Sequence, residues 1–387
     1  MSNTITNLIP DAIAGMEITS REIVGLIPRV TRNASAERTA KGTTVRNPVA
    51  PTATAAAITP AATPPALSDK TYTNRTISMS NLYGSQFYYD GEEQAGLKMS
   101  GAYPSMFAQN IAEAIRAIVA EIETDLAELY YNSARAYGTA GTAPFGTDLS
   151  DAAAVKHILD TNGAPMSNRH LVLSLDAGYN YRSLTQLTNV NQAGTDGTLR
   201  NGLLFPLQGF EVAESAYIQT HTVGTSTGQD CTAVEPIGET TIAYDGGDGG
   251  TILVGDTITP ASDTTGPGGS AAKYVVNTAV TAAAGSIVIN ANGLRKATTI
   301  GQEIALGSTD YVANMAFSSD AFVLATRPPV KPEGGDASSD DVVLTDPVSG
   351  LSFLLSMYKG YHANNYELSI LWGVGKGNPA HAAILMG

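Results

Sequence analysis

The chain has 387 residues, of which 43% are hydrophobic and 15% are charged, and its formal net charge is −14. This length allows about two or three domains with buried cores, which excludes a chain that is disordered throughout. The acidic balance, without any Lys/Arg cluster, argues against a protein that grips nucleic-acid phosphates, and the single cysteine, Cys231, excludes an intramolecular disulfide framework.

The sequence also lacks the features of a membrane or exported protein. No apolar run approaches the roughly 20 residues that span a bilayer, and the first residues show no basic segment followed by an apolar core. We therefore expect neither membrane insertion nor export by a signal peptide.

The N-terminal residues 1–33 carry two short apolar clusters, each beside residues that are typical of a helix start. The clusters are Leu8, Ile9, Ala12, Ile13 and Met16, and then Ile23, Val24, Leu26 and Ile27. They predict small amphipathic pieces with little to bury themselves against.

Two segments with strand character, 43–49 and 71–80, flank a run of Ala, Thr and Pro at 51–65. One interpretation of the run is a disordered linker. The alternative is a long hairpin whose tip becomes ordered only against another molecule, because alone it cannot offset its conformational entropy. An aromatic cluster follows at 87–89 and leads into the next element.

The segment from Tyr103 to Gly138 predicts one long helix, around which the chain is organised. Its apolar residues recur at steps of three and four, which keeps them on one face: Ile111, Ile115, Ile118, Ile122, Leu126 and Leu129. Pro104 suits the first turn and Gly138 the position after the end, so the helix would be roughly 50 Å long. The charged residues fall on the opposite, exposed face in this interpretation: Glu113, Arg116, Glu121, Glu123, Asp125 and Glu128.

The rest of the chain predicts an α+β fold interrupted by a β-rich insertion. The expected helices are Asp151–Leu159, Tyr179–Leu187 and Ser319–Ala325, and the expected strands are His170–Leu175, Phe210–Ile218, Leu351–Tyr358 and Glu367–Trp372. Between Thr225 and Ser308 the composition shifts to Gly, Thr, Ala and Asp, with short strands separated by glycine turns. We expect an all-β domain there, with strands at Thr251–Thr259, Lys273–Val280, Ser286–Asn290 and Glu303–Leu306.

Two glycine-rich motifs suggest chemistry, and neither has the context that the chemistry needs. Residues 224–228 match the G-x-S-x-G pattern of a hydrolase nucleophile elbow around Ser226, but no convincing helix start follows. Residues 373–377 are similar to a phosphate-binding loop, but Asn378-Pro379 follows in place of a helix and the spacing fits neither phosphate motif, so we interpret them as a terminal turn.

No metal site emerges from the pattern of potential ligands. The histidines lack both the H-E-x-x-H spacing and a nearby cysteine: His157, His170, His221, His362 and His381. Asp245 and Asp248 flank glycines, but a calcium loop supplies more oxygen ligands. We therefore predict no catalytic, cofactor-binding or metal-binding residues, and no cofactor.

Several strings resemble the major capsid (coat) proteins of tailed bacteriophages, in particular the branch with a β-barrel inserted in the A-domain. They are Asn-Leu-Ile-Pro-Asp at 7–11, Ser-Arg-Glu-Ile-Val-Gly-Leu-Ile-Pro at 20–28, Gly-Phe-Glu-Val-Ala-Glu-Ser at 209–215, Asn-Met-Ala-Phe-Ser-Ser-Asp-Ala-Phe-Val-Leu-Ala-Thr at 314–326 and Glu-Leu-Ser-Ile-Leu-Trp-Gly-Val-Gly-Lys-Gly-Asn-Pro at 367–379. The resemblance spans nearly the whole chain, and 314–326 is its most specific part.

The resemblance implies the fold shared by tailed phages and herpesviruses, divided along the chain in a fixed order. The expected parts are an N-arm at 1–35, an E-loop hairpin at 36–82, a P-domain with the spine helix at 83–140, the A-domain at 141–224 and 310–340, the inserted β-barrel at 225–309, and C-terminal P- and A-domain strands at 341–387. Some relatives cross-link a loop lysine to an asparagine, but the branch resembled here does not, so Lys41 and Lys70 receive no such role.

The implied function is that of a structural, non-enzymatic subunit of an icosahedral shell around double-stranded DNA. Its partners would be copies of itself in hexamers and pentamers, with a scaffolding protein, a portal and a decoration protein as further partners, and it would be made in the host cytoplasm and end in the virion. Two alternatives stay open at this point: a tail or adhesin component, and a serine hydrolase built on Ser226.

Overall fold

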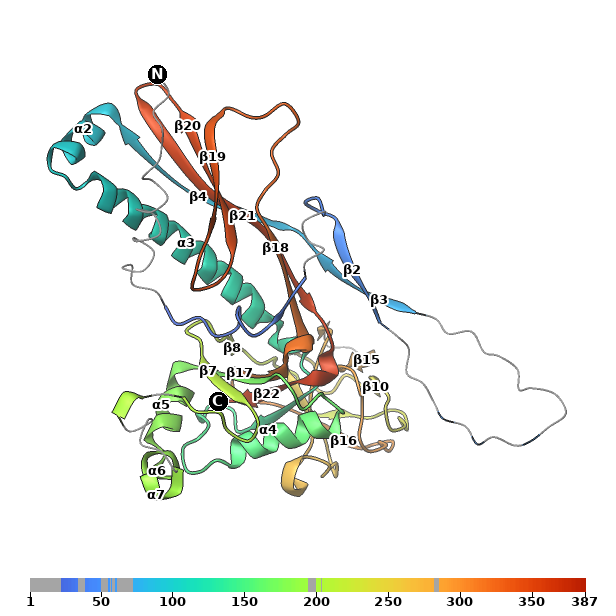
Figure 1. Cartoon of the computed structure of the whole chain (residues 1–387). Helices are drawn as coiled ribbons and strands as arrows, with labels where there is room; N and C mark the ends of the chain where they lie inside the picture. The colour runs from blue at the N-terminus through green and yellow to red at the C-terminus, as the bar shows by residue number, and fades with distance from the viewer. Residues whose placement is uncertain are drawn as a thin grey trace.

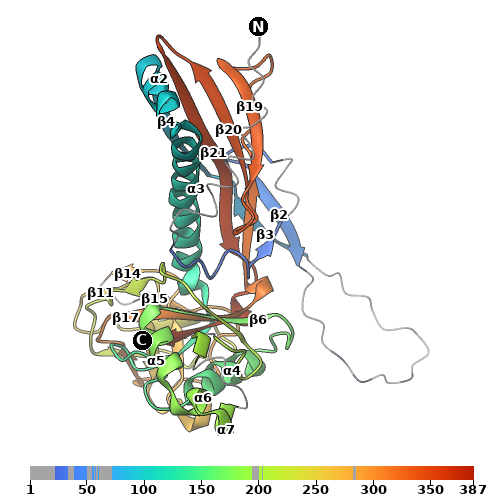
Figure 2. The ribbon, with the colours of Figure 1, turned by 60° about the vertical axis from the view of Figure 1, so that its left-hand side comes forward.

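The computed structural model describes residues 22–33, 39–49, 55, 57, 60, 72–193, 200–202, 204–281 and 285–387. These residues form an elongated upper body, built from one long helix and a sheet, above a broader lower body of mixed strands and helices (Figure 1). A two-stranded hairpin leaves the upper body on the side away from the long helix (Figure 2). The fold is mixed α+β, as the sequence predicts.

The upper body is a six-stranded sheet with helix α3 packed on it. The strand order is β1-β18-β21-β20-β19, and β4 pairs with β21; β1 is parallel to β18 and the other pairs are antiparallel. The elements are β1 (Thr31–Arg32), β4 (Asn81–Asp90), α2 (Gly91–Met99), α3 (Tyr103–Ala127), β18 (Phe322–Arg327), β19 (Ser338–Thr345), β20 (Ser352–Lys359) and β21 (Ala363–Lys376).

The lower body is a ten-stranded sheet with helices on it, in the order β7-β6-β17-β22-β5-β13-β12-β16-β9, with β8 on β17. Its strands are β5 (Arg135–Gly138), β6 (Arg169–Leu173), β7 (Glu211–Glu214), β8 (Thr220–His221), β9 (Gln229–Asp230), β12 (Thr257–Pro260), β13 (Lys273–Val275), β16 (Glu303–Leu306), β17 (Tyr311–Ser318) and β22 (Ala382–Met386). Its helices are α4 (Ser150–Thr161), α5 (Leu175–Ser183), α6 (Thr185–Thr188) and α7 (Val190–Ala193).

Short 3-10 turns and strand pairs complete the described chain. The turns are η2 (Glu128–Asn132), η3 (Pro267–Gly269), η4 (Ser319–Ala321) and η5 (Pro379–His381). The small antiparallel pairs are β2 (Thr44–Val49) with β3 (Thr73–Ser78), β10 (Thr241–Tyr244) with β15 (Gly285–Val288), and β11 (Thr251–Ile252) with β14 (Val280–Thr281).

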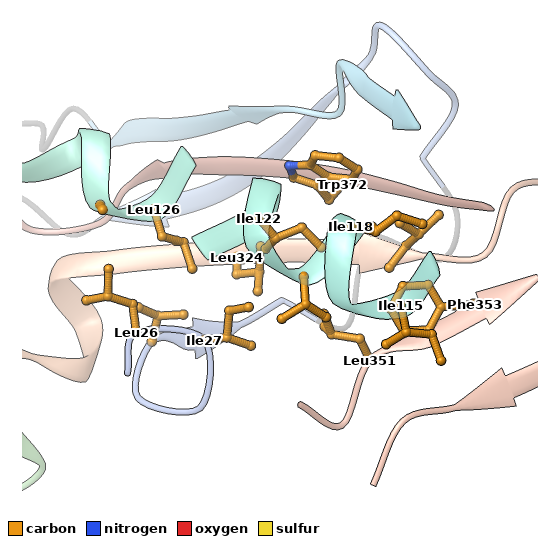
Figure 3. Packing of buried hydrophobic residues seen from close by; sticks show 14 of the residues in the cluster. Leu26, Ile27, Ile115, Ile118, Ile122, Leu126, Leu324, Leu351, Phe353 and Trp372 are labelled. Carbon is orange, nitrogen blue, oxygen red and sulfur yellow. The ribbon is translucent and has the colours of Figure 1, made fainter. Parts of the chain in front are cut away.

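The apolar stripe of α3 is buried as predicted. Ile111, Ile115, Ile122 and Leu126 are at most 1% exposed, and they pack against β18, β20 and β21 (Figure 3). The helix begins at Tyr103 with proline in its first turn, as expected.

The predicted length of the spine helix is wrong. The α-helix ends at Ala127, so its 25 residues span about 37 Å. The chain then tightens into η2 and continues as β5, which pairs with β22 and β13 in the lower sheet. Those two ladders satisfy the backbone of 135–138 in the strand conformation, and Gly138 lies in a strand with a φ of 110° instead of ending a helix.

Two further helix predictions need correction. Residues 319–325 were expected to be helical, but only Ser319–Ala321 form a 3-10 turn, and β18 follows because Phe322–Arg327 pair with β21. The helix expected at Tyr179–Leu187 begins earlier, at Leu175, where the hydroxyl of Ser174 caps it, and it breaks at Leu184, whose backbone is extended.

The inserted segment 225–309 has its own core, and its strands are divided between two small sheets of its own, β10-β15 and β11-β14, and the ten-stranded sheet of the lower body. Its described residues form strands and one 3-10 turn, and twelve of its side chains make a buried cluster that includes Tyr244, Tyr274 and Ile287. Strand β13 nevertheless pairs with β5, so the ladder of the insertion runs on into the lower body. Whether the insertion is a separate domain stays a prediction.

The N-terminal prediction is wrong for the residues that can be checked. Residues 22–30 form turns and extended backbone without a helix, and Leu26 and Ile27 are fully buried against α3. The first apolar cluster, at 8–16, lies outside the described residues, as does most of the Ala/Thr/Pro run at 51–65.

Candidate functional site

Ser226 does not sit in a nucleophile elbow. The residues that follow it form strand β9 instead of a helix, and the side chain is only 4% exposed. Its hydroxyl accepts a hydrogen bond from Nε2 of Gln229. Without a helix after the serine there is no helix N-terminus to help build an oxyanion hole.

A buried histidine and carboxylate do meet nearby, but their third partner is a tyrosine. Nε2 of His221 lies 2.8 Å from Oδ1 of Asp256, and its Nδ1 lies 2.8 Å from the hydroxyl of Tyr130. Burial raises the pKa of Tyr130 to about 12, and the charge of Asp256 acts in the same direction. Both ring nitrogens are occupied, so this histidine has no lone pair or proton to exchange with a serine.

The hydrogen bonds among Tyr130, His221 and Asp256 hold separate elements of the fold together. This trio joins η2, at the lower end of the spine, to β8 and to the loop before β12. Asp256 also accepts hydrogen bonds from the N–H groups of Gly224 and Leu253. The trio therefore ties the first residues of the insertion to the end of the spine. Sequence reasoning missed it because its members are 91 and 35 residues apart along the chain.

The glycines at 373–377 serve a close crossing of strands. Residues 373–376 belong to β21 and not to a terminal turn, which corrects the interpretation from sequence. A Cβ on Gly373 would lie 2.2 Å from the carbonyl oxygen of Ser78, and one on Gly375 would lie 2.8 Å from Cγ1 of Ile77. The glycines thus let the base of the hairpin pass directly over β21.

The described residues hold no group of three or more His, Cys, Asp or Glu side chains that could bind a metal ion. Asp245 lies in an exposed turn, where the N–H groups of Asp230 and Gly247 donate to it and lower the pKa of its carboxyl. Of the two loop lysines, Lys41 is exposed and Lys70 lies outside the described residues.

A large hollow on the described surface contains few ionisable groups. It is an open groove of about 770 Å³ beside η2, and its lining contains one carboxylate, Glu128, and one ammonium, Lys376, without histidine, cysteine or serine.

Among the described helices, none is long and apolar enough to cross a membrane.

The hairpin has the character of an attachment element. Its described base is anchored, because Val45, Ile77 and Met79 form a small core with side chains of β18 and β21. In the described part of the chain, β2 and β3 pair only with each other. An isolated two-stranded hairpin is marginally stable in water, so this one is suited to gain its stability from another molecule.

The charge of the hairpin is opposite to that of the chain. Its described residues at 39–49 and 72–78 carry Lys41, Arg46 and Arg75 and no carboxylate, in a chain whose net charge is −14. Exposed carboxylates lie on the opposite border of the upper body, along α2 and α3 (Figure 2): Glu92, Glu93, Glu113 and Glu121. A second exposed group lies in and just before β19: Glu333, Asp336, Asp340 and Asp341.

Glu123 is a buried polar residue that sequence reasoning placed wrongly. It was assigned to the exposed face of the spine, yet it is fully buried. The buried face of α3 is wider than the single stripe, because Ala112, Val119 and Ala127 are also buried. Glu123 lies four residues from both Val119 and Ala127, and this spacing was the signal that could have placed it inside.

Searches against known proteins give matches only among solved structures. No protein-family model matches the sequence, and no curated protein matches it. A structure from Mycobacterium phage Che8 has a TM-score of 0.48 at 12% identity, over 95% of this chain and 93% of that chain.

Two further structures are those of phage capsids. The capsid structure of the cyanophage P-SCSP1u has a TM-score of 0.48 at 12% identity, over 95% of this chain and 89% of that chain. The asymmetric unit of the mature capsid of bacteriophage PhiM1 has a TM-score of 0.47 at 9% identity, over 95% and 88% respectively. All three likenesses are distant in sequence.

Proposed function

We propose that this chain is the shell-forming subunit of a tailed-phage capsid, which assembles with copies of itself into the icosahedral container of a double-stranded DNA genome. The observation that carries the proposal is the basic hairpin, whose described strands are anchored at their base and leave the upper body on the side away from α3 (Figure 2). A monomer has no use for such an element, whereas a subunit can lay it on its neighbour.

The position of the hairpin supports head-to-tail assembly. It leaves the upper body on the side away from α2 and α3, and one group of exposed carboxylates lies along α2 and α3 (Figures 1 and 2). In a ring of identical subunits, one side of each copy meets the other side of the next. The basic hairpin of one copy would then meet the acidic border of its neighbour, which favours this orientation.

The resemblance in the sequence assigns each part of the subunit to a domain of the capsid fold. Residues 22–33 act as the N-arm, the hairpin as the E-loop, the upper body as the P-domain, and the lower body as the A-domain with its insertion at 225–309. Scaffolding, portal and decoration proteins are proposed as further partners, with synthesis in the host cytoplasm and a final location in the virion. The acidic subunit would have little nonspecific attraction for the DNA that it encloses.

The charge of Arg46 tests this arrangement. Arg46 is exposed on the hairpin, outside its small core, so Arg46→Glu should leave the fold of the body intact. We expect it to weaken assembly, measured by light scattering against protein concentration, because it places a carboxylate opposite the acidic border of the neighbour. Arg46→Lys keeps the charge and serves as the control that still assembles. Equal assembly of both variants would contradict the proposed contact.

A further inference from the structure

The carboxylate of Glu123 joins three separate parts of the chain. Its Oε1 accepts hydrogen bonds from the N–H groups of Gly25 and Leu26, both at 2.7 Å, and from the hydroxyl of Ser215 at 2.8 Å. Its Oε2 accepts from the N–H of Ile27 at 3.0 Å. The donors therefore come from the N-terminal segment 22–30, called here the arm, and from the end of β7 in the lower body, while the acceptor belongs to α3.

Two ion pairs also connect the arm to α3 and to the lower body. Glu22 of the arm lies 2.6 Å from Arg116 of α3, and Arg29 of the arm lies 2.8 Å from Glu211 of β7. The arm thus lies across the joint between the two bodies and touches both. Figure 3 shows Leu26 and Ile27 of the arm beside Ile122 and Leu126 of α3.

The arm also fits the lower body closely. A Cβ on Gly25 would lie 2.5 Å from the carbonyl oxygen of Glu214 and 2.8 Å from Cγ1 of Val172. Any side chain at this position would push the arm away from the lower body. Gly25 is therefore a position at which the arm can be displaced without changing any side chain of the joint itself.

Displacing the arm would leave the charge of Glu123 with a single hydrogen-bond partner. Three of the four donors to Glu123 belong to the arm, so its departure leaves only Ser215. A buried carboxylate without hydrogen bonds is costly, and burial already raises the pKa of Glu123 against the opposing effect of these bonds. Protonation of Glu123, entry of water into the space that the arm vacates, and separation of α3 from the lower body would each relieve this cost.

We propose that docking of the arm and the angle between the two bodies are coupled through Glu123. With the arm docked, the carboxylate fixes α3 against the end of β7. With the arm displaced, the joint opens and the angle between the bodies becomes variable. Glu123 is therefore a positioning residue. Whether it holds α3 against β7 depends on whether the arm is docked. This inference does not depend on what the assembled subunit encloses.

The coupling can be measured in the full chain with two spin labels. Tyr361→Cys places one label at the tip of the upper body, where Tyr361 is 94% exposed, and Met166→Cys places the other on the lower body, where Met166 is 78% exposed. The buried Cys231 is replaced by Ala, and excess unlabelled chain is added so that only distances within one chain are measured. Trypsin cleavage after Arg29, which lies within the arm, reports release of the arm.

Gly25→Ala is the decisive variant, because it acts on the arm and leaves Glu123 in place. We expect roughly tenfold faster cleavage of the arm, as loss of hydrogen bonds to a charged group commonly changes an equilibrium by at least that factor, together with a broader distance distribution. Gly96→Ala is the matched control, since a Cβ on Gly96 meets nothing within 4 Å. It should change neither measurement.

Glu123→Gln provides the reciprocal test, with the exposed Glu121→Gln as its control on the same helix. We expect Glu123→Gln to release the arm and broaden the distances together, while circular dichroism shows both bodies still folded. The proposal is overturned if Gly25→Ala frees the arm without changing the distances, if Glu123→Gln changes the distances while the arm stays protected, or if neither variant changes either measurement.

Discussion

At the scale of single residues, hydrogen bonding separates a serine in a suggestive motif from a catalytic one. Ser226 has a partner, Gln229, but no base, because the nearby His221 is held on both sides by Asp256 and Tyr130. The sequence motif depends on five adjacent residues, whereas catalysis depends on residues brought together by the fold. The motif alone could not distinguish the two cases.

Replacing Ser226 tests this interpretation. We expect Ser226→Ala to lower the free energy of unfolding by about 1 kcal/mol, because Nε2 of Gln229 loses its acceptor, and to leave assembly unchanged. Chemical denaturation and light scattering measure the two effects. Hydrolysis of a simple ester by the natural protein but not by the variant would show that Ser226 is a nucleophile after all.

At the scale of elements, the periodicity of apolar residues predicts which face of a helix or strand is buried better than it predicts where the element ends. The stripe of α3 and strands β2, β3, β6, β16 and β20 fall close to where the sequence places them, because their burial pattern is local. The end of α3 and the strand β18 were missed, because their conformation is decided by pairing with β22, β13 and β21, which lie far away in the sequence. Glu123 was misplaced for a related reason, since its partners are 92 to 98 residues away.

The buried stripe of the spine makes a direct prediction. Ile118 is 4% exposed within the stripe, so Ile118→Asp should prevent soluble folding. Burying an unpaired carboxylate costs several kcal/mol, which is comparable with the whole stability of a domain.

The matched control is Ala117→Asp, which introduces the same side chain at the preceding, exposed position. It should fold and remain soluble in the same expression trial. Normal shells from Ile118→Asp would mean that the stripe is not the face that packs on the sheet.

The inserted segment makes a second prediction at this scale. Because residues 225–309 contain a buried cluster of their own, the fragment expressed alone should give a β-type circular dichroism spectrum and a cooperative melt. It should be less stable than in the whole chain, since β13 loses its pairing with β5 and Asn290 loses its hydrogen bonds to the carbonyl groups of Tyr131 and Ser133. A random-coil spectrum would rule out an independently folding insertion.

At the scale of the whole molecule, the order of elements along the chain was predictable and their joints were not. The described residues contain a hairpin, a long helix, a mixed α+β body and a β-rich segment, whereas the division into N-arm, E-loop, P-domain, A-domain and inserted domain stays a prediction. The joints at Glu123 and at His221 depend on burial of polar groups by distant segments. Such groups look like ordinary surface residues in a sequence.

The central claim is that this chain builds closed shells from copies of itself, and electron microscopy of the purified full-length protein tests it most directly. We predict icosahedral shells, or capsomer-like rings at low concentration, because β2 and β3 pair only with each other among the described residues. A protein that stays strictly monomeric at high concentration, with its hairpin protected against proteolysis in the monomer, would contradict the account.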